Sequence, residues 1–267
     1  MYRRKKREFL PESACAGETM PSIKKQLIIL LFGLALYIAI TSGGFLFLRS
    51  LSIAVSAAVL AESLALYLKN KKISWSESSV ITGIIIGFVF SSDSTSVVLI
   101  LASLLAISSK YLIRINKRHL FNPAGLGIFL VMLLLGANSE WKGTYLWYIL
   151  VPLGLYLAYK TRKLELLIGY FLGTFILFGV QAFWQKSPLL NIPGTFSYFF
   201  IFIMLIEPKT TPSKTTAKIV FGLDVAAAIF IFSNLGVRFD AELASLLLLN
   251  MFVPALNKLP ELKPGKT

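Results

Sequence analysis

Charged residues are scarce in this sequence. They make up 15% of its 267 residues, against about 25% in an ordinary soluble domain. Hydrophobic residues account for 56%, and the mean hydropathy is +0.73. A soluble fold of this length needs more polar surface than this composition supplies. The sequence therefore predicts an all-α membrane protein, with the lipid bilayer as the solvent for much of the chain.

Cysteine and histidine each occur once, as Cys15 and His119. A single cysteine excludes a disulfide framework and a thiolate metal site within one chain. A single histidine cannot form a metal-binding cluster, so no metal site is expected. No apolar run precedes Cys15, which argues against a lipoprotein signal, and no hydrophilic stretch is long enough to form a second domain.

Acidic residues are also few: 13 Asp and Glu stand against 27 Lys and Arg, which gives a formal net charge of +14. The basic residues form short clusters between apolar runs instead of one basic face, which argues against nucleic-acid binding. The run from Arg3 to Arg7 is not followed by the apolar segment and cleavage site of a signal peptide. We interpret residues 1–24 as a cytoplasmic polybasic tail suited to anionic lipid, with Met1 or Met20 as the start.

Ten apolar runs predict ten transmembrane helices. None alternates between apolar and polar residues as a strand of a membrane barrel would. Several are shorter than the ~20 residues that cross a ~30 Å hydrocarbon core, so some helices must be tilted, broken or shielded. The runs are 26–48, 51–68, 79–91, 96–113, 123–137, 145–159, 164–184, 194–206, 217–235 and 241–257.

The basic residues predict the orientation of these runs. With ten spans, 23 of the 27 Lys and Arg fall on the side of the N-terminus. Such an excess marks the cytoplasmic side, so both termini are expected in the cytoplasm and the chain in the plasma membrane. Residues 25–258 then form one transmembrane domain and 259–267 a cytoplasmic tail. The four basic residues on the outer side are Arg49, Lys142, Lys186 and Arg238.

The third and eighth runs are the shortest, and each ends at a polar loop with an acidic residue. These loops are Ser91–Ser96, which contains Asp93, and Glu207–Pro212. The two runs are five spans apart, so the halves 25–137 and 145–258 cross the membrane in opposite senses. Paired short segments of this kind mark inverted repeats with a central binding site. The loop hydroxyls could cap the broken helix ends or contact a ligand.

Polar residues inside or beside the spans are the candidates for function. Asn122 before Pro123 predicts a helix start, and capping is enough to explain the asparagine. Glu62 and Asp224 would each cost roughly 2.5–3.5 kcal/mol or more at the bilayer centre if charged and unpaired. We therefore expect both to face the bundle or a cavity. With Asp93 they are candidates for a cation or proton pathway, or else they make structural hydrogen bonds.

Two further features have simpler interpretations. His119 lies in a basic boundary loop, where a solvated switch or an interface residue is expected. The pairs Gly83 with Gly87 and Gly169 with Gly173 have the spacing of small-residue helix packing faces.

An ordered set of short motifs is similar to two related membrane proteins, RnfD of Rnf-type electron-transport complexes and NqrB of sodium-pumping NADH:quinone oxidoreductases. The resemblance covers roughly residues 80–257. The motifs are Gly83-Ile84-Ile85-Ile86-Gly87, Ser109-Lys110, Leu120-Phe121-Asn122-Pro123-Ala124, Ile206-Glu207-Pro208-Lys209-Thr210, Phe221-Gly222 and Asn250-Met251-Phe252-Val253-Pro254.

The resemblance implies a ten-helix inverted-repeat fold related to urea and ammonium channels. It also implies a flavin-carrying member of a complex that couples electron transfer to Na⁺ or H⁺ movement, with other membrane and soluble subunits as partners. By position, Asn122, Glu207 and Thr210 fall where the family lines its flavin region. Glu207 replaces the usual Asp of the family, and His119 stands where the family commonly has Asn.

One departure from the family is large. The family attaches FMN covalently to a threonine in an S-G-A-T type motif, in a long outer loop between the fifth and sixth helices. Here that loop is only 137–144, and neither Thr144 nor Thr195 lies in such a motif. We expect no covalent FMN, while a non-covalent flavin, riboflavin or FMN, remains compatible with the retained site. We assign no catalytic residue, and two other interpretations stay open: a channel or transporter without a redox role, and a structural membrane anchor.

Overall fold

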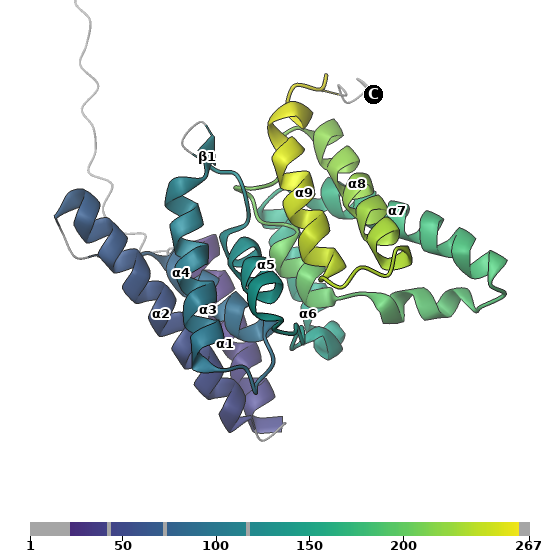
Figure 1. The fold of residues 1–267 in the computed structure, drawn as a ribbon. Coiled ribbons are helices and arrows are strands. Elements are labelled where there is room, and N and C mark those ends of the chain that lie inside the picture. The colour runs from purple at the N-terminus through teal and green to yellow at the C-terminus, as the bar shows by residue number, and fades with distance from the viewer. Residues whose placement is uncertain (1–21, 42–43, 72–73, 116–117, 262–267) are drawn as a thin grey trace, which may run out of the picture.

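The computed structural model describes residues 22–41, 44–71, 74–115 and 118–261 of the chain. This part is helical apart from one two-stranded hairpin (Figure 1). The basic run from Arg3 to Arg7, Cys15 and Met20 lie outside the described residues, as does the tail from residue 262 onward. The elements are α1 (Ile23–Thr41), α2 (Phe45–Asn70), α3 (Glu77–Val89), α4 (Ser96–Leu112), β1 (Arg114–Ile115), β2 (Arg118–His119), α5 (Pro123–Leu135), η1 (Thr144–Leu146), α6 (Trp147–Lys160), α7 (Leu164–Trp184), η2 (Leu189–Thr195), η3 (Phe200–Met204), α8 (Thr215–Asn234) and α9 (Ala241–Leu256).

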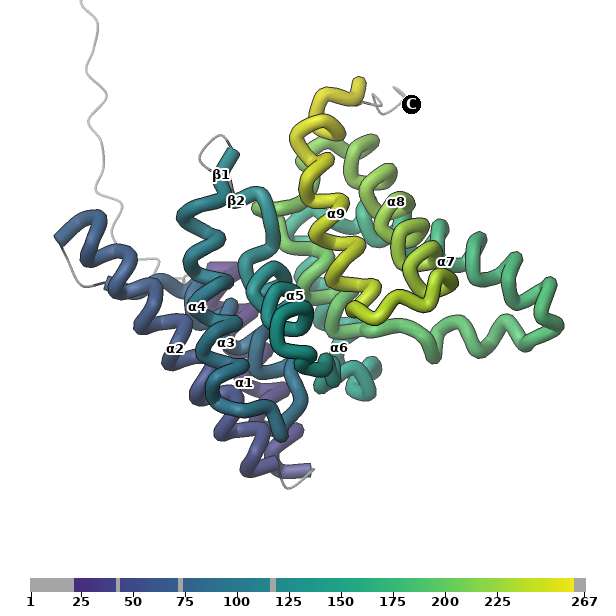
Figure 2. Tube along the Cα trace, in the orientation of Figure 1, coloured from purple at the N-terminus to yellow at the C-terminus, as the bar shows by residue number. Residues whose placement is uncertain are grey.

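Four of these helices, α1, α2, α7 and α8, are long and apolar enough to cross a membrane. Shorter apolar helices, α3, α4, α5 and α9, pack among them. Figure 2 shows the segment after α7 at the edge of the molecule, while α7 itself packs along α8. The chain is therefore a multi-pass, all-α membrane protein, as the composition predicted.

Nine of the ten predicted runs contain an α-helix in the described part of the chain. The bounds of the first run were wrong, and the eighth run is irregular, as expected for a short or broken segment. The first run was drawn through to residue 48, whereas α1 ends at Thr41 and α2 begins at Phe45. Apolar character continues through this turn, so hydropathy does not mark it. The eighth run is not an α-helix: in η3 the N–H of Leu205 donates to the carbonyl of Phe200, five residues earlier.

Glycines bring neighbouring helices into backbone contact. This was predicted from the spacing of the glycine pairs in α3 and α7. A Cβ on Gly83 would lie 2.5 Å from the Cα of Val55 in α2. A Cβ on Gly169 in α7 would overlap the carbonyl oxygen of Ile219 in α8. Only glycine permits such close approach, so these positions fix α3 on α2 and α8 on α7.

The two halves of the described chain pack in the same order. In the first half α2 packs on α4, α4 on α5, and α1 on α3. In the second half α7 packs on α8, α8 on α9, and α6 on η3. Each of these three contacts in the first half thus has a counterpart five segments later.

The third and eighth segments meet at the centre of the molecule. Phe88 of α3 and Phe199, directly before η3, are fully buried and stack with ring centroids 4.9 Å apart. With 13 residues, α3 is about 20 Å long at ~1.5 Å per residue, which is shorter than the hydrocarbon core. Both segments are short and internal, and neither is a lipid-facing rod.

The end of α3 is closed by the loop 137–144 and not by the hydroxyls of Ser91–Ser96. The backbone N–H groups of Glu140 and Lys142 donate to the carbonyls of Val89 and Phe88, at 2.7 and 2.8 Å. The Lys142 ammonium donates to the Phe90 carbonyl and pairs with Glu140. A cation at the C-terminus of a helix also complements the helix dipole. Helix α3 is therefore capped by a segment about fifty residues further along the chain.

Candidate functional site

A cavity of about 470 Å³ lies between α1, α3, α5, α6 and the segment around η3, at the end of the molecule that carries the β1–β2 hairpin. We call it the hairpin-end cavity. Its interior is apolar, with Ile85, Leu157 and Phe202 among the lining side chains, and its rim carries Lys24, Lys160, Lys209 and Glu207. A cavity of this size, with apolar walls and a few polar groups, has the features of a small-molecule site.

Asn122 and Pro123 line this cavity from the start of α5. The Asn122 side chain accepts a hydrogen bond from the N–H of Gly125 at 3.0 Å, which is the predicted cap. Its backbone N–H donates to the side-chain oxygen of Asn250 at 3.1 Å. The Asn122 side chain satisfies the N–H of Gly125 and Asn250 satisfies the N–H of Asn122, so these bonds hold Asn122 beside the cavity.

Asn250 connects this helix start to the loop that follows η3. Its side-chain nitrogen donates to the carbonyl of Thr210 at 3.1 Å, and the residue is fully buried in α9. Asn250 belongs to one of the sequence motifs, but it was not among the predicted site residues. The available signal was an asparagine inside an otherwise apolar helix, where a buried amide needs partners.

His119 and Glu207 complete the cluster. The hydroxyl of Thr210 donates to Glu207 at 3.4 Å, and the Nε2 atom of His119 lies 3.5 Å from the other carboxylate oxygen of Glu207. His119 is buried, and the hairpin holds it in place by pairing with Arg114. The structure thus brings Asn122, Glu207, Thr210 and His119 together, although they come from two distant parts of the chain.

The rim of the hairpin-end cavity is positively charged. Burial lowers the pKa of Lys209 below its ordinary value, and the positive charges of Lys24 and Lys110 lower it further. Glu207 opposes this effect. A ligand that brings a negative group to this rim would relieve the repulsion between the lysines.

Glu62 is buried between α2 and α4, close to this end of the molecule. One of its oxygens accepts hydrogen bonds from Lys110 at 2.7 Å, from Tyr111 at 2.8 Å and from Ser76 at 3.1 Å. The other oxygen is buried without a hydrogen-bond partner among the described residues. Glu62 is therefore paired inside the bundle, and its role in an ion pathway stays a prediction.

The other two acids of the expected pathway lie elsewhere. Asp93 is exposed in the turn before α4, at the opposite, distal end of the molecule, near Lys142. Asp224 is partly buried at the middle of α8, where it lines a groove formed with α9. The three acids thus occupy three separate parts of the described structure.

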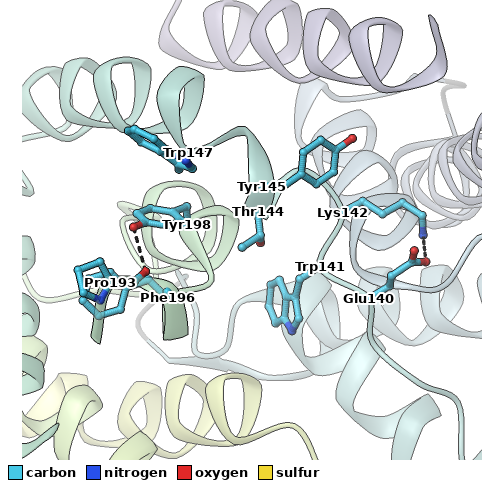
Figure 3. Close-up of a pocket in the computed structure, with 10 residues that line it drawn as sticks. Glu140, Trp141, Lys142, Thr144, Tyr145, Trp147, Pro193, Phe196 and Tyr198 are labelled. Atoms are coloured by element: carbon cyan, nitrogen blue, oxygen red, sulfur yellow. Dashed lines mark hydrogen bonds and ion pairs between the residues drawn. The ribbon is translucent and has the colours of Figure 1, made fainter. Parts of the chain in front are cut away.

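A second hollow, of about 720 Å³, opens at the distal end (Figure 3). We call it the distal hollow. Aromatic side chains dominate its lining, with Trp141, Tyr145 and Trp147 from one segment and Tyr198 from the other. Thr144 lines it as well, and the Thr144 hydroxyl has no hydrogen-bond partner among the described residues.

The Glu140–Lys142 pair lies at the edge of the distal hollow, with 2.7 Å between the ammonium and the carboxylate (Figure 3). Burial alone would raise the pKa of Glu140, but the hydrogen bond and charge of Lys142 outweigh it and hold this pKa below its ordinary value. Burial lowers the pKa of Lys142, against the opposing effect of Glu140. The part of the chain that the structure describes holds no cluster of three His, Cys, Asp or Glu suited to a metal ion.

Comparison with known proteins adds one match. The NQR2, RnfD, RnfE family matches residues 130–264, which contain Glu207, Thr210 and Asn250. No curated protein matches the chain.

Proposed function

This chain belongs to the NQR2, RnfD, RnfE family, and on that premise we propose that it is the membrane subunit of a flavin-linked electron-transport complex that moves Na⁺ or H⁺. Family membership makes it a subunit of a multi-subunit membrane complex. The partners proposed here are further membrane subunits and soluble subunits that deliver or accept electrons. The chain itself supplies binding, orientation and electrostatics, as proteins do for redox cofactors.

We also propose that the fold consists of ten membrane segments in two inverted halves, with both termini in the cytoplasm. The equal order of packing in the two halves supports this arrangement. The central position of α3 and η3 supports it further, because broken segments occupy corresponding positions in inverted repeats. On this orientation the hairpin-end cavity faces the cytoplasm and the distal hollow faces the outside.

The convergence of Asn122, His119, Glu207 and Thr210 beside a cavity is the observation that supports flavin binding. A non-covalent flavin fits the chemistry of this cavity: its apolar walls suit the ring system, and the rim lysines suit a phosphate. Asn122 and Glu207 line the cavity and would fix the orientation of the flavin, and Thr210 would hold Glu207 in place. The flavin supplies the electron-carrying chemistry, while the protein excludes water and holds the ring in place.

The short loop 137–144 supports the proposal that this chain carries no covalent FMN. Thr144 lies in that loop and lines the distal hollow, but it stands outside the motif that the family uses. Covalent and non-covalent flavin are separated by one experiment. After denaturation and precipitation of the purified chain, a non-covalent flavin stays in the supernatant and a covalent one stays with the protein.

Absorbance of the purified chain at about 450 nm tests flavin binding directly. Thr161 lines the mouth of the hairpin-end cavity, so Thr161→Trp should lower the flavin content severalfold. Thr41→Trp, at the exposed end of α1, is the matched control and should keep it. A colourless wild-type protein that releases no flavin on denaturation would overturn this proposal.

A second candidate function is a channel or transporter for a small solute or ion. The hollows at the two ends support it, because the buried Phe88–Phe199 pair lies between them on α3 and the segment before η3. Flux through liposomes that needs no reductant, from a protein without flavin, would favour this function. A protein with neither flavin nor flux would leave the role of a structural anchor for reductase partners.

A further inference from the structure

A carboxylate lies on an apolar outer groove of the second half. Asp224 stands at the middle of α8 and lines a groove of about 460 Å³ with Leu248, Leu249, Phe252 and Leu256 of α9. Leu248 and Phe252 are exposed, at 40% and 52%. The structure shows no hydrogen bond or ion pair between Asp224 and any other described residue. The groove is thus a membrane-facing apolar surface with one polar group at its centre.

Lipid alone does not suit this surface. A carboxylate at the middle of a transmembrane helix is costly in hydrocarbon, and such residues almost always pair with another group. Glu62 in α2 and Glu165 in α7 follow this rule, since they pair with Lys110 and Lys218. Asp224 has no such partner among the described residues, so we look for its partner in another protein.

A second copy of this chain is less suited to supply that partner. A two-fold contact over the groove would place two Asp224 carboxylates against each other. The lysines inside helices α4 and α8, Lys110 and Lys218, are buried and already paired with Glu62 and Glu165. Neither could reach the Asp224 of a neighbouring copy.

We propose that the groove between α8 and α9 binds a transmembrane helix of another protein in the complex, and that this helix presents a lysine or arginine to Asp224. Its apolar side chains would pack on Leu248 and Phe252. Polar contacts of this kind hold membrane helices together where no hydrophobic driving force exists. The inference concerns assembly and goes beyond the proposed function, because it does not depend on whether flavin is bound.

Model transmembrane helices test the proposal. Cys15 is the sole cysteine, so the chain with Cys15→Ser and Lys258→Cys carries one fluorophore at the exposed end of α9, near the groove. The probes are labelled leucine-rich helical peptides with lysine, or with leucine, at the central position. In lipid vesicles, energy transfer should show association with the lysine peptide on the order of tenfold stronger than with the leucine peptide.

The substitution Asp224→Asn should abolish this preference, Asp224→Glu should keep it, and Asp93→Asn is the control at the distal end. Equal association of both peptides with the wild type, or a preference that survives Asp224→Asn, would overturn the proposal. Energy transfer between two labelled copies that depends on Asp224 would overturn it in favour of a homodimer. Flavin content is measured on the same samples. Loss of the peptide preference with normal flavin content would count against the helix-binding groove alone, and not against the proposed function.

Discussion

The side-chain oxygen of Asn250 lies 3.1 Å from the backbone nitrogen of Asn122, although 128 positions separate the two residues. Through its nitrogen, the same amide holds the carbonyl of Thr210. One buried side chain therefore joins the start of α5 to the loop after η3. These two segments come from different halves of the chain, and the hairpin-end cavity lies between them.

Replacing Asn250 with leucine should destabilise the protein markedly. The change leaves the N–H of Asn122 and the carbonyl of Thr210 buried without partners, and each such group costs about 1–3 kcal/mol. Thermal unfolding in detergent, followed by circular dichroism, measures the loss. Asn191→Ala is the control, because Asn191 is exposed, and it should unfold like the wild type. Equal stability of the two variants would refute the bridging role.

Lys142→Met should lower the melting temperature more than Lys186→Met. Lys142 is buried and donates to the Phe90 carbonyl at the end of α3, whereas Lys186 is an exposed lysine of the next loop on this side. Loss of the ammonium leaves that carbonyl unsatisfied, at a cost of about 1–3 kcal/mol. Similar melting temperatures for both variants would mean that the backbone bonds of the loop alone hold α3.

The Glu140–Lys142 pair predicts a defined pH dependence. Because the folded protein lowers the pKa of Glu140 below the ordinary value of a glutamate, the ionised carboxylate favours folding above that ordinary pKa. This contribution should fade as the pH falls through the lowered pKa. The difference in melting temperature between wild type and Glu140→Gln should therefore be largest near neutral pH and shrink in acid. Glu261→Gln, at an exposed position near the C-terminus, should show no such trend.

Gly222→Ala should weaken the packing of α7 on α8. A Cβ at Gly222 would overlap the carbonyl oxygen of Leu166, which is backbone and cannot move aside easily. Overpacking of this kind typically costs about 1–3 kcal/mol. Gly33→Ala in α1 is the control: no atom lies within 4 Å of its Cβ, so we expect unchanged or slightly raised stability. A stable Gly222→Ala variant would show that the two helices tolerate greater separation.

Reporter fusions test the proposed orientation. A reporter fused at Lys160, at the end of α6, should report the cytoplasm. One fused at Lys186, after α7, should report the outside. A single span separates the two sites, so the same answer from both would contradict the ten-segment arrangement.

Much of the fold could be predicted from the sequence, because hydropathy and charge act locally. The membrane class, nine of the helices and the glycine packing faces followed from these patterns. The cap at Asn122 followed from its neighbour Pro123. The four proposed site residues were named from motifs, and the structure places them together.

What the sequence could not predict depends on contacts between distant residues. The role of Asn250 requires Asn122 and Thr210 to be near, and nothing local indicates that. From the sequence, Lys142 was only one of the basic residues on the outer side. In the structure it caps α3 from the loop 137–144, a role for which the serines of Ser91–Ser96 were candidates. The lateral position of Asp224 follows from how α8 and α9 pack, which a lone acid in an apolar run does not reveal.

The cap of α3 also limits how the protein can move. The loop 137–144 connects the two halves and at the same time holds the carbonyls of Phe88, Val89 and Phe90. Separating the halves at this end would expose those carbonyls, so the distal end should act as a fixed pivot. We therefore expect the two halves to stay together at the distal end during any motion of the protein.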